Sequence, residues 1–63
     1  MASSKDVIKI IEADGWKRIK ANAGSHAQFK HPTKKGRVTV PDPKKDLDNI
    51  TVKSIMRQAG LDN

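Results

Sequence analysis

Residues 25–41 read SHAQFKHPTKKGRVTVP, and this stretch decides the fold. Two short runs of alternating polar and apolar residues, 25–31 and 37–41, flank a Pro-Thr-Lys-Lys-Gly segment. Alternation places successive side chains of a strand on opposite faces, and Pro and Gly are typical of tight turns. The stretch therefore predicts two antiparallel strands joined by a turn.

The two faces of this hairpin differ in chemistry. One face is apolar and carries Ala27, Phe29, Val38 and Val40. The other face is polar and carries His26, Gln28, Lys30, Arg37 and Thr39. Because Phe29 is the single Phe of the chain, we expect its face to be buried and the face that carries His26 to be open.

Three further elements flank the hairpin. Residues 16–21 predict a strand that extends it to a three-stranded antiparallel meander. We expect Ile19 to be the inward residue of this strand, which places Arg18 and Lys20 on the open face. Residues 3–14 and 49–59 predict helices, because each segment has apolar residues at i, i+3 and i+4 and is followed by a glycine.

Each predicted helix has one apolar stripe, so together the helices cover only one face of the sheet. The predicted fold is therefore α+β, in the order α-β-β-β-α, with both helices on one face of a three-stranded antiparallel sheet. Residues 1–63 are expected to form a single domain.

Composition narrows the class of protein. The chain has no Cys, which excludes disulfides and thiolate metal sites. It shows no signal-peptide pattern and no apolar run long enough to span a bilayer, so a cytoplasmic protein without membrane contact is expected. Thirteen Lys and Arg against seven Asp and Glu give a net charge of +6, which favours a polyanionic partner over a merely solvated surface.

The predicted open face suits the phosphate backbone of a nucleic acid. It carries cations that would supply sequence-independent affinity. Lys44 and Lys45 follow the third strand in a polar loop and are expected to close over a substrate. The candidate RNA-binding residues are Lys20, Gln28, Lys30, Arg37, Lys44 and Lys45.

His26 is the candidate catalytic residue on this face. A neutral imidazole can take a proton from a ribose 2′-hydroxyl and then return a proton to a leaving oxygen. No metal site is predicted, because His26 and His31 project to opposite faces and carboxylates are few. No cofactor is expected. His31 is interpreted as structural, since it stands before Pro32 at a strand end, and Trp16 is interpreted as part of the core.

The chain also resembles a known family. The segments Glu12-Ala-Asp-Gly-Trp16, Gly24-Ser25-His26-Ala-Gln-Phe29-Lys-His-Pro32, Val38-Thr-Val-Pro41 and Ile55-Met-Arg-Gln-Ala-Gly-Leu61 are similar in order and content to the HicA toxins of bacterial toxin–antitoxin modules. The similarity covers nearly the whole chain, and its Gly-Ser-His-x-x-Phe segment is the most specific part.

The resemblance implies a double-stranded-RNA-binding-like fold and ribosome-independent cleavage of mRNA. It also implies His26 as the catalytic residue and a HicB-type antitoxin as the partner, through which alone the toxin would contact DNA. The chain departs from the pattern at Ala27 and Asp42, two positions that are often His in the family. Alternation places Ala27 on the buried face, so little chemistry is lost there, whereas Asp42 leaves a role open.

Three functions are compatible with these features. The first is a metal-independent endoribonuclease toxin. The second is a non-catalytic RNA-binding module of the same fold, and the third is a domain that only binds another protein. RNA that stays intact during long incubation would indicate the second function, and absence of RNA binding at low salt would indicate the third.

Overall fold

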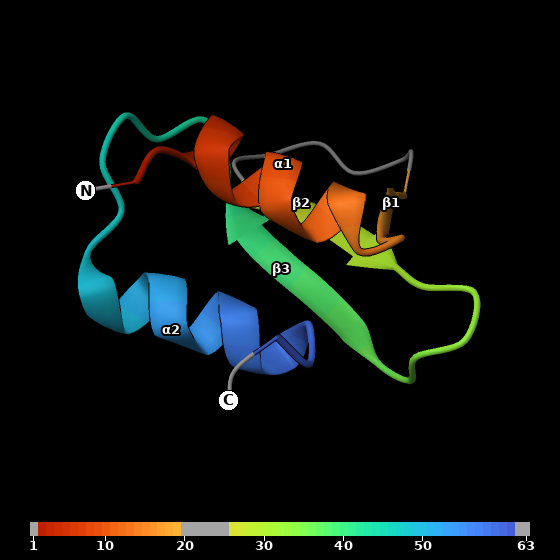
Figure 1. Cartoon of the computed structure of the whole chain (residues 1–63). Coiled ribbons are helices and arrows are strands. Elements are labelled where there is room, and N and C mark those ends of the chain that lie inside the picture. The colour runs from red at the N-terminus through yellow and green to blue at the C-terminus, as the bar shows by residue number, and fades with distance from the viewer. Residues whose placement is uncertain (1, 20–25, 62–63) are drawn as a thin grey trace.

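The computed structural model describes residues 2–19 and 26–61. In chain order, its elements are α1 (Ser4–Ala13), β1 (Lys17–Arg18), β2 (His26–Lys30), β3 (Arg37–Pro41) and α2 (Asn49–Gln58). The strands form one antiparallel sheet in the order β1-β2-β3. Figure 1 shows α1 lying over this sheet and α2 beside β3. This is the α-β-β-β-α arrangement that the sequence predicts.

One face of the sheet forms the core together with both helices. Phe29 of β2 and Val38 of β3 are paired across the strands and fully buried. The other core residues of the described chain are Val7, Ile11, Trp16, Ala27, Val40, Leu47, Ile55 and Ala59. Because residues of α1 and α2 both pack against this one set of strand residues, both helices lie on the same face, as predicted.

Each helix begins at a side chain that satisfies free backbone N–H groups. Ser3 caps α1 in a reciprocal capping box, in which its hydroxyl accepts from Asp6 N and the Asp6 carboxylate accepts from Ser3 N. Asp48 caps α2 by accepting from Thr51 N at 2.7 Å. Such caps stabilise a helix by about 1 kcal/mol each, which matters in so small a domain.

α2 is attached to the sheet at the free edge of β3. The side-chain carbonyl of Gln58 accepts a hydrogen bond from Thr39 N at 3.0 Å, which satisfies a donor that faces away from β2. At the other end of the core, Trp16 Nε1 donates to Ala59 O at 3.3 Å. The expectation that Trp16 belongs to the core is confirmed, since only 1% of its surface is exposed.

The prediction of which side chains of the first strand face the core is wrong, because the alternation is shifted by one residue. Lys17 pairs with Lys30 and Arg18 pairs with Phe29, and paired residues of an antiparallel ladder share a face. Arg18 therefore lies on the helix side of the sheet, whereas Lys17 and Ile19 lie on the open side. Trp16, and not Ile19, is the inward residue that sets this register. Its side chain packs against the end of α2.

The segment between β3 and α2 is held against the start of α1. Ser4 is buried, and its N–H donates to Lys44 O at 3.0 Å while its hydroxyl donates to Pro41 O. Leu47 N donates to Ala2 O at 2.7 Å, and the Asp42–Pro43 peptide bond is cis. These contacts join residues about forty positions apart, so the loop lies beside α1.

The caps make the stability of the fold depend on acid. Hydrogen bonds from Ser3 to Asp6 and from Thr51 to Asp48 lower the pKa of both carboxyl groups below 3.8, and Lys34 does the same to the pKa of Asp14. The folded state thus binds fewer protons than the unfolded state in acid. The stabilisation that these three carboxylates contribute is fully present above about pH 4. It is lost as the pH falls through their pKa values in the folded state.

We therefore predict that the urea midpoint at pH 3 is lower than at pH 6, as measured by circular dichroism. Asp14→Asn should make this decrease smaller, because it removes one of the three carboxylates. A urea midpoint that is constant between pH 6 and pH 3 would contradict this linkage.

Candidate nucleic-acid interface

The face of the sheet opposite the helices is uncovered over the described strands, and the register divides its side chains into three rows. The first row crosses all three strands and consists of Lys17, Lys30 and Arg37. The second row consists of Ile19, Gln28 and Thr39, since Ile19 N donates to Gln28 O at 2.8 Å. The third row includes His26 and Pro41. Successive rows are about 7 Å apart, which is two residues along a strand.

His26 stands at one end of this face. It is the first residue of β2, it is exposed, and its cross-strand partner is Pro41. Its imidazole makes no hydrogen bond or ion pair with the described part of the chain. The described residues therefore leave both ring nitrogens open to a ligand, as proton transfer to or from a bound substrate would require.

Gln28 connects the His26 end of the face to its cationic end. Its side chain is half-buried and lies two residues from His26 on the same face. Arg37 Nη1 donates weakly to Gln28 Oε1 at 3.5 Å. The guanidinium of Arg37 thus leans toward the second row, and the amide nitrogen of Gln28 has no hydrogen-bond partner among the described residues.

The structure places the other candidate residues apart from His26. Lys20 lies outside the described residues. Lys30 is exposed on the open face but four residues from His26, about 13 Å along the strand. Lys44 and Lys45 are exposed and line a groove of about 680 Å³ beside α1, together with Lys5, Ile8 and Arg18 among others. They therefore belong to a different surface, and their contact with RNA stays a prediction.

Asp42 forms an ion pair on the side of the sheet that the helices cover. Arg18 Nη2 donates to Asp42 Oδ2 at 3.0 Å, and both side chains line the groove beside α1. Ala27 is buried on the same side of the sheet, as alternation predicts. The two positions at which the chain departs from the family pattern therefore lie away from the face that carries His26.

His31 is fixed by contacts from two segments, residues 14–16 and 33–34, which fits its interpretation as structural. Its side chain is only 8% exposed. Nδ1 accepts from Thr33 N and Lys34 N at 3.1 and 3.0 Å, so Nε2 carries the proton and donates to Asp14 O at 2.7 Å. The ring also meets Trp16 edge-on, with centroids 5.1 Å apart.

Gly15 is required beside this ring. Its φ is +107°, and a Cβ at this position would lie 2.7 Å from His31 Nε2. Lys34 completes the junction, because its ammonium group contacts both the Asp14 carboxylate and Ala59 O. The turn after β2 is thereby joined to the ends of α1 and α2, and His31 is unavailable for chemistry on a substrate.

Two classes of feature were not found over residues 2–19 and 26–61. No helix there is long and apolar enough to cross a membrane. No three His, Asp or Glu side chains in this part of the chain come together as ligands for a metal ion.

Comparisons with known proteins agree with this architecture. Residues 4–61 match the family described as "HicA toxin of bacterial toxin-antitoxin". A solved structure described as a toxin–antitoxin complex from Streptococcus pneumoniae contains a chain that is 27% identical, with a TM-score of 0.78. The superposition covers 94% of this chain and 97% of that one. No curated protein sequence gives a match.

The two histidines should differ in their effect on stability. His31→Ala removes the acceptor for Thr33 N and Lys34 N and the donor to Asp14 O, so we predict a loss of about 2–4 kcal/mol in the free energy of unfolding. His26→Ala removes an exposed side chain that has no hydrogen bond or ion pair to residues 2–19 and 26–61, and it should change the free energy of unfolding by less than about 0.5 kcal/mol. Urea denaturation of both variants measures the difference. Equal losses would show that one of the two sites is wrongly described.

Proposed function

Because this chain belongs to the HicA family of toxins, we propose that it is an endoribonuclease that cleaves mRNA in the cytoplasm without a metal ion. His26 is its catalytic residue, and the open face of the sheet is its RNA-binding surface. The observation that carries this proposal is an exposed imidazole, without a partner among the described residues, at the end of a sheet face that the helices leave uncovered.

The chemistry follows from that placement. His26 in its neutral form takes the proton of a ribose 2′-hydroxyl, and the 2′-oxygen attacks the adjacent phosphorus. The bond from phosphorus to the 5′-oxygen of the next nucleotide breaks, and a protonated imidazole returns a proton to that oxygen. The products are a 2′,3′-cyclic phosphate and a 5′-hydroxyl, so atoms and charge balance without a cofactor.

Gln28 is the described neighbour best placed to help. Its amide group lies on the same face two residues from His26 and can donate to a phosphate oxygen as negative charge develops. The cations of the first row do not surround His26, because they lie two rows away. We propose that they bind the substrate, and that Lys44 and Lys45 act from the side of the groove.

The partner in this proposal is a HicB-type antitoxin that covers the open face. Both the family and the solved toxin–antitoxin complex support an antitoxin partner. An antitoxin that lies over His26 would block the reaction without altering the fold. The antitoxin would also supply any contact with DNA.

One observation favours a second function, a non-catalytic RNA-binding module. Among the described residues, no second titratable side chain approaches His26, since Asp42 pairs with Arg18 and Ala27 carries no acid or base. A single imidazole must then serve as both base and acid. If it does not, the same face binds RNA and leaves it intact.

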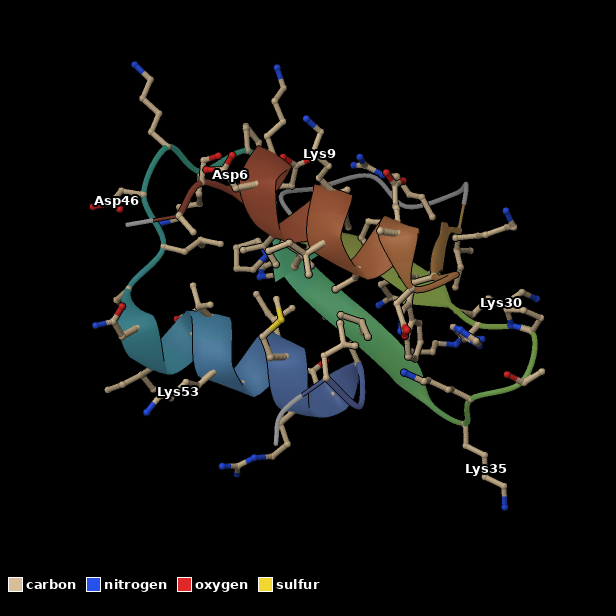
Figure 2. The ribbon with its side chains drawn as sticks, viewed as in Figure 1. Asp6, Lys9, Lys30, Lys35, Asp46 and Lys53 are labelled. Carbon is tan, nitrogen blue, oxygen red and sulfur yellow. The ribbon has the colours of Figure 1, made fainter. Side chains whose placement is uncertain are left out.

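The decisive test is the fate of a defined RNA incubated with purified protein in EDTA. We predict cleavage that leaves 2′,3′-cyclic phosphate ends, and a rate at least about 100-fold lower for His26→Ala. Lys9→Gln is the matched control, because Figure 2 shows Lys9 pointing away from the sheet on the outer side of α1.

Three outcomes would count against the proposal. Undiminished cleavage by His26→Ala would overturn the catalytic assignment. Cleavage that EDTA abolishes would indicate a metal-dependent reaction. RNA that is bound but never cut would select the non-catalytic module.

A further inference from the structure

The first row of the open face places three cations side by side. Lys17 pairs with Lys30, and Lys30 pairs with Arg37, so one row of like charges crosses all three strands. All three residues are exposed. Directly opposed like charges on neighbouring strands destabilise a sheet. Lys30, in the middle, experiences this repulsion from both sides.

No carboxylate relieves this repulsion within residues 2–19 and 26–61. The ion pairs found there involve Arg18, His31 and Lys34, with Asp42 and Asp14 as partners. Arg37 has only its weak contact with Gln28. An anion from outside the chain would therefore be attracted by all three cations, and its binding would reduce the repulsion between them.

The position of the row relative to His26 indicates which anion fits. The row and His26 lie four residues apart on β2, about 13 Å along the strand, with an uncharged row between them. Each step between rows, about 7 Å, is close to the distance between successive phosphates in an extended RNA strand. An RNA that follows β2 would thus bring a phosphate to each row in turn.

We propose that this cation row is a phosphate subsite that sets the register of RNA on the enzyme. Lys17 and Lys30 bind the phosphate two nucleotides from the bond whose cleavage His26 catalyses. Arg37 leans toward Gln28 and binds the phosphate between. The register of the RNA rests on the proposed function, because it is measured from the bond that His26 cleaves. The binding of RNA by the cation row does not depend on the proposed function.

The first test measures binding without cleavage, in the His26→Ala background, by fluorescence anisotropy with a short single-stranded RNA. Lys17→Gln, Lys30→Gln and Arg37→Gln should each weaken binding roughly tenfold. Each should also reduce the slope of log K against log[salt] by about 0.7. Lys53→Gln is the matched control and should change affinity by less than about twofold, because Figure 2 shows Lys53 on the outer side of α2.

A second readout separates a binding row from a structural one. Lys30→Gln should raise the urea midpoint at low salt while it weakens RNA binding, because it relieves repulsion from both neighbours. Lys53→Gln should change neither quantity. If Lys30→Gln lowers both stability and affinity, Lys30 supports the fold and the proposal fails.

The register is tested with RNAs that carry one uncharged methylphosphonate at successive phosphates around the mapped cleavage bond. Wild-type protein should show a raised KM when the neutral phosphate lies two nucleotides from that bond on one side. Lys30→Gln should lose this sensitivity, and Arg37→Gln should lose it at the phosphate between. Sensitivity confined to the cleaved phosphate, or unchanged in the variants, would overturn the register.

These experiments keep the two proposals distinguishable. If RNA is never cut but the row variants still weaken its binding, the nuclease proposal fails and the row stands as an RNA site. If RNA affinity is unchanged in the row variants while binding of a polyglutamate peptide is lost, the row serves an acidic protein segment, and our proposal is wrong.

Discussion

The pairing of Phe29 with Val38, buried between the sheet and the helices, is the contact on which the other positions depend. β2 is the central strand, so the side chain that it buries fixes the face of every residue paired to either side. Once Phe29 points to the helices, alternation sends His26, Gln28 and Lys30 to the opposite face. Both helices are used to bury one side of the sheet, and the other side is left to a ligand or partner.

The local part of this arrangement could be predicted from the sequence. The hairpin is predicted by its own sequence, because alternation places four apolar residues of two short strands on one face and the turn between them determines which strands pair. The helices are predicted by their capping residues and apolar stripes. The family resemblance adds a role for His26 that a lone histidine on a strand would not indicate.

The first strand and the loop after β3 could not be placed in the same way. Ile19 is apolar and was expected to point inward, but β1 pairs through only two residues and takes its register from Trp16, whose indole reaches the end of α2. Lys44 is held by Ser4, forty residues earlier. Such long-range contacts leave no local pattern. The sequence places Lys30 and Arg37 on the open face, but the position of Lys17 beside them depends on the register of β1 and could not be predicted.

Charge and stability oppose each other on the open face. The sheet keeps three opposed cations in one row, although the described residues offer no carboxylate to neutralise them. Among the described residues, Arg18 pairs with Asp42 and Lys34 pairs with Asp14, whereas the exposed lysines elsewhere have no ion pair either. The row is distinguished because its three cations are directly opposed on neighbouring strands, which destabilises a sheet in a domain that has little stability to lose. This cost is the reason for proposing that the row binds an anion.

RNA is proposed to lie on the open face of the sheet, and the isoleucines of the chain report directly on where it binds. All six, at positions 8, 10, 11, 19, 50 and 55, lie within the described residues, and Ile19 alone is on the open face. NMR spectra of isoleucine methyl groups in His26→Ala protein should show the Ile19 signal shifting as RNA is added, while those of Ile50 and Ile55 stay in place. A shift at Ile50 with Ile19 unchanged would place the RNA on the helix side of the sheet and contradict this binding face.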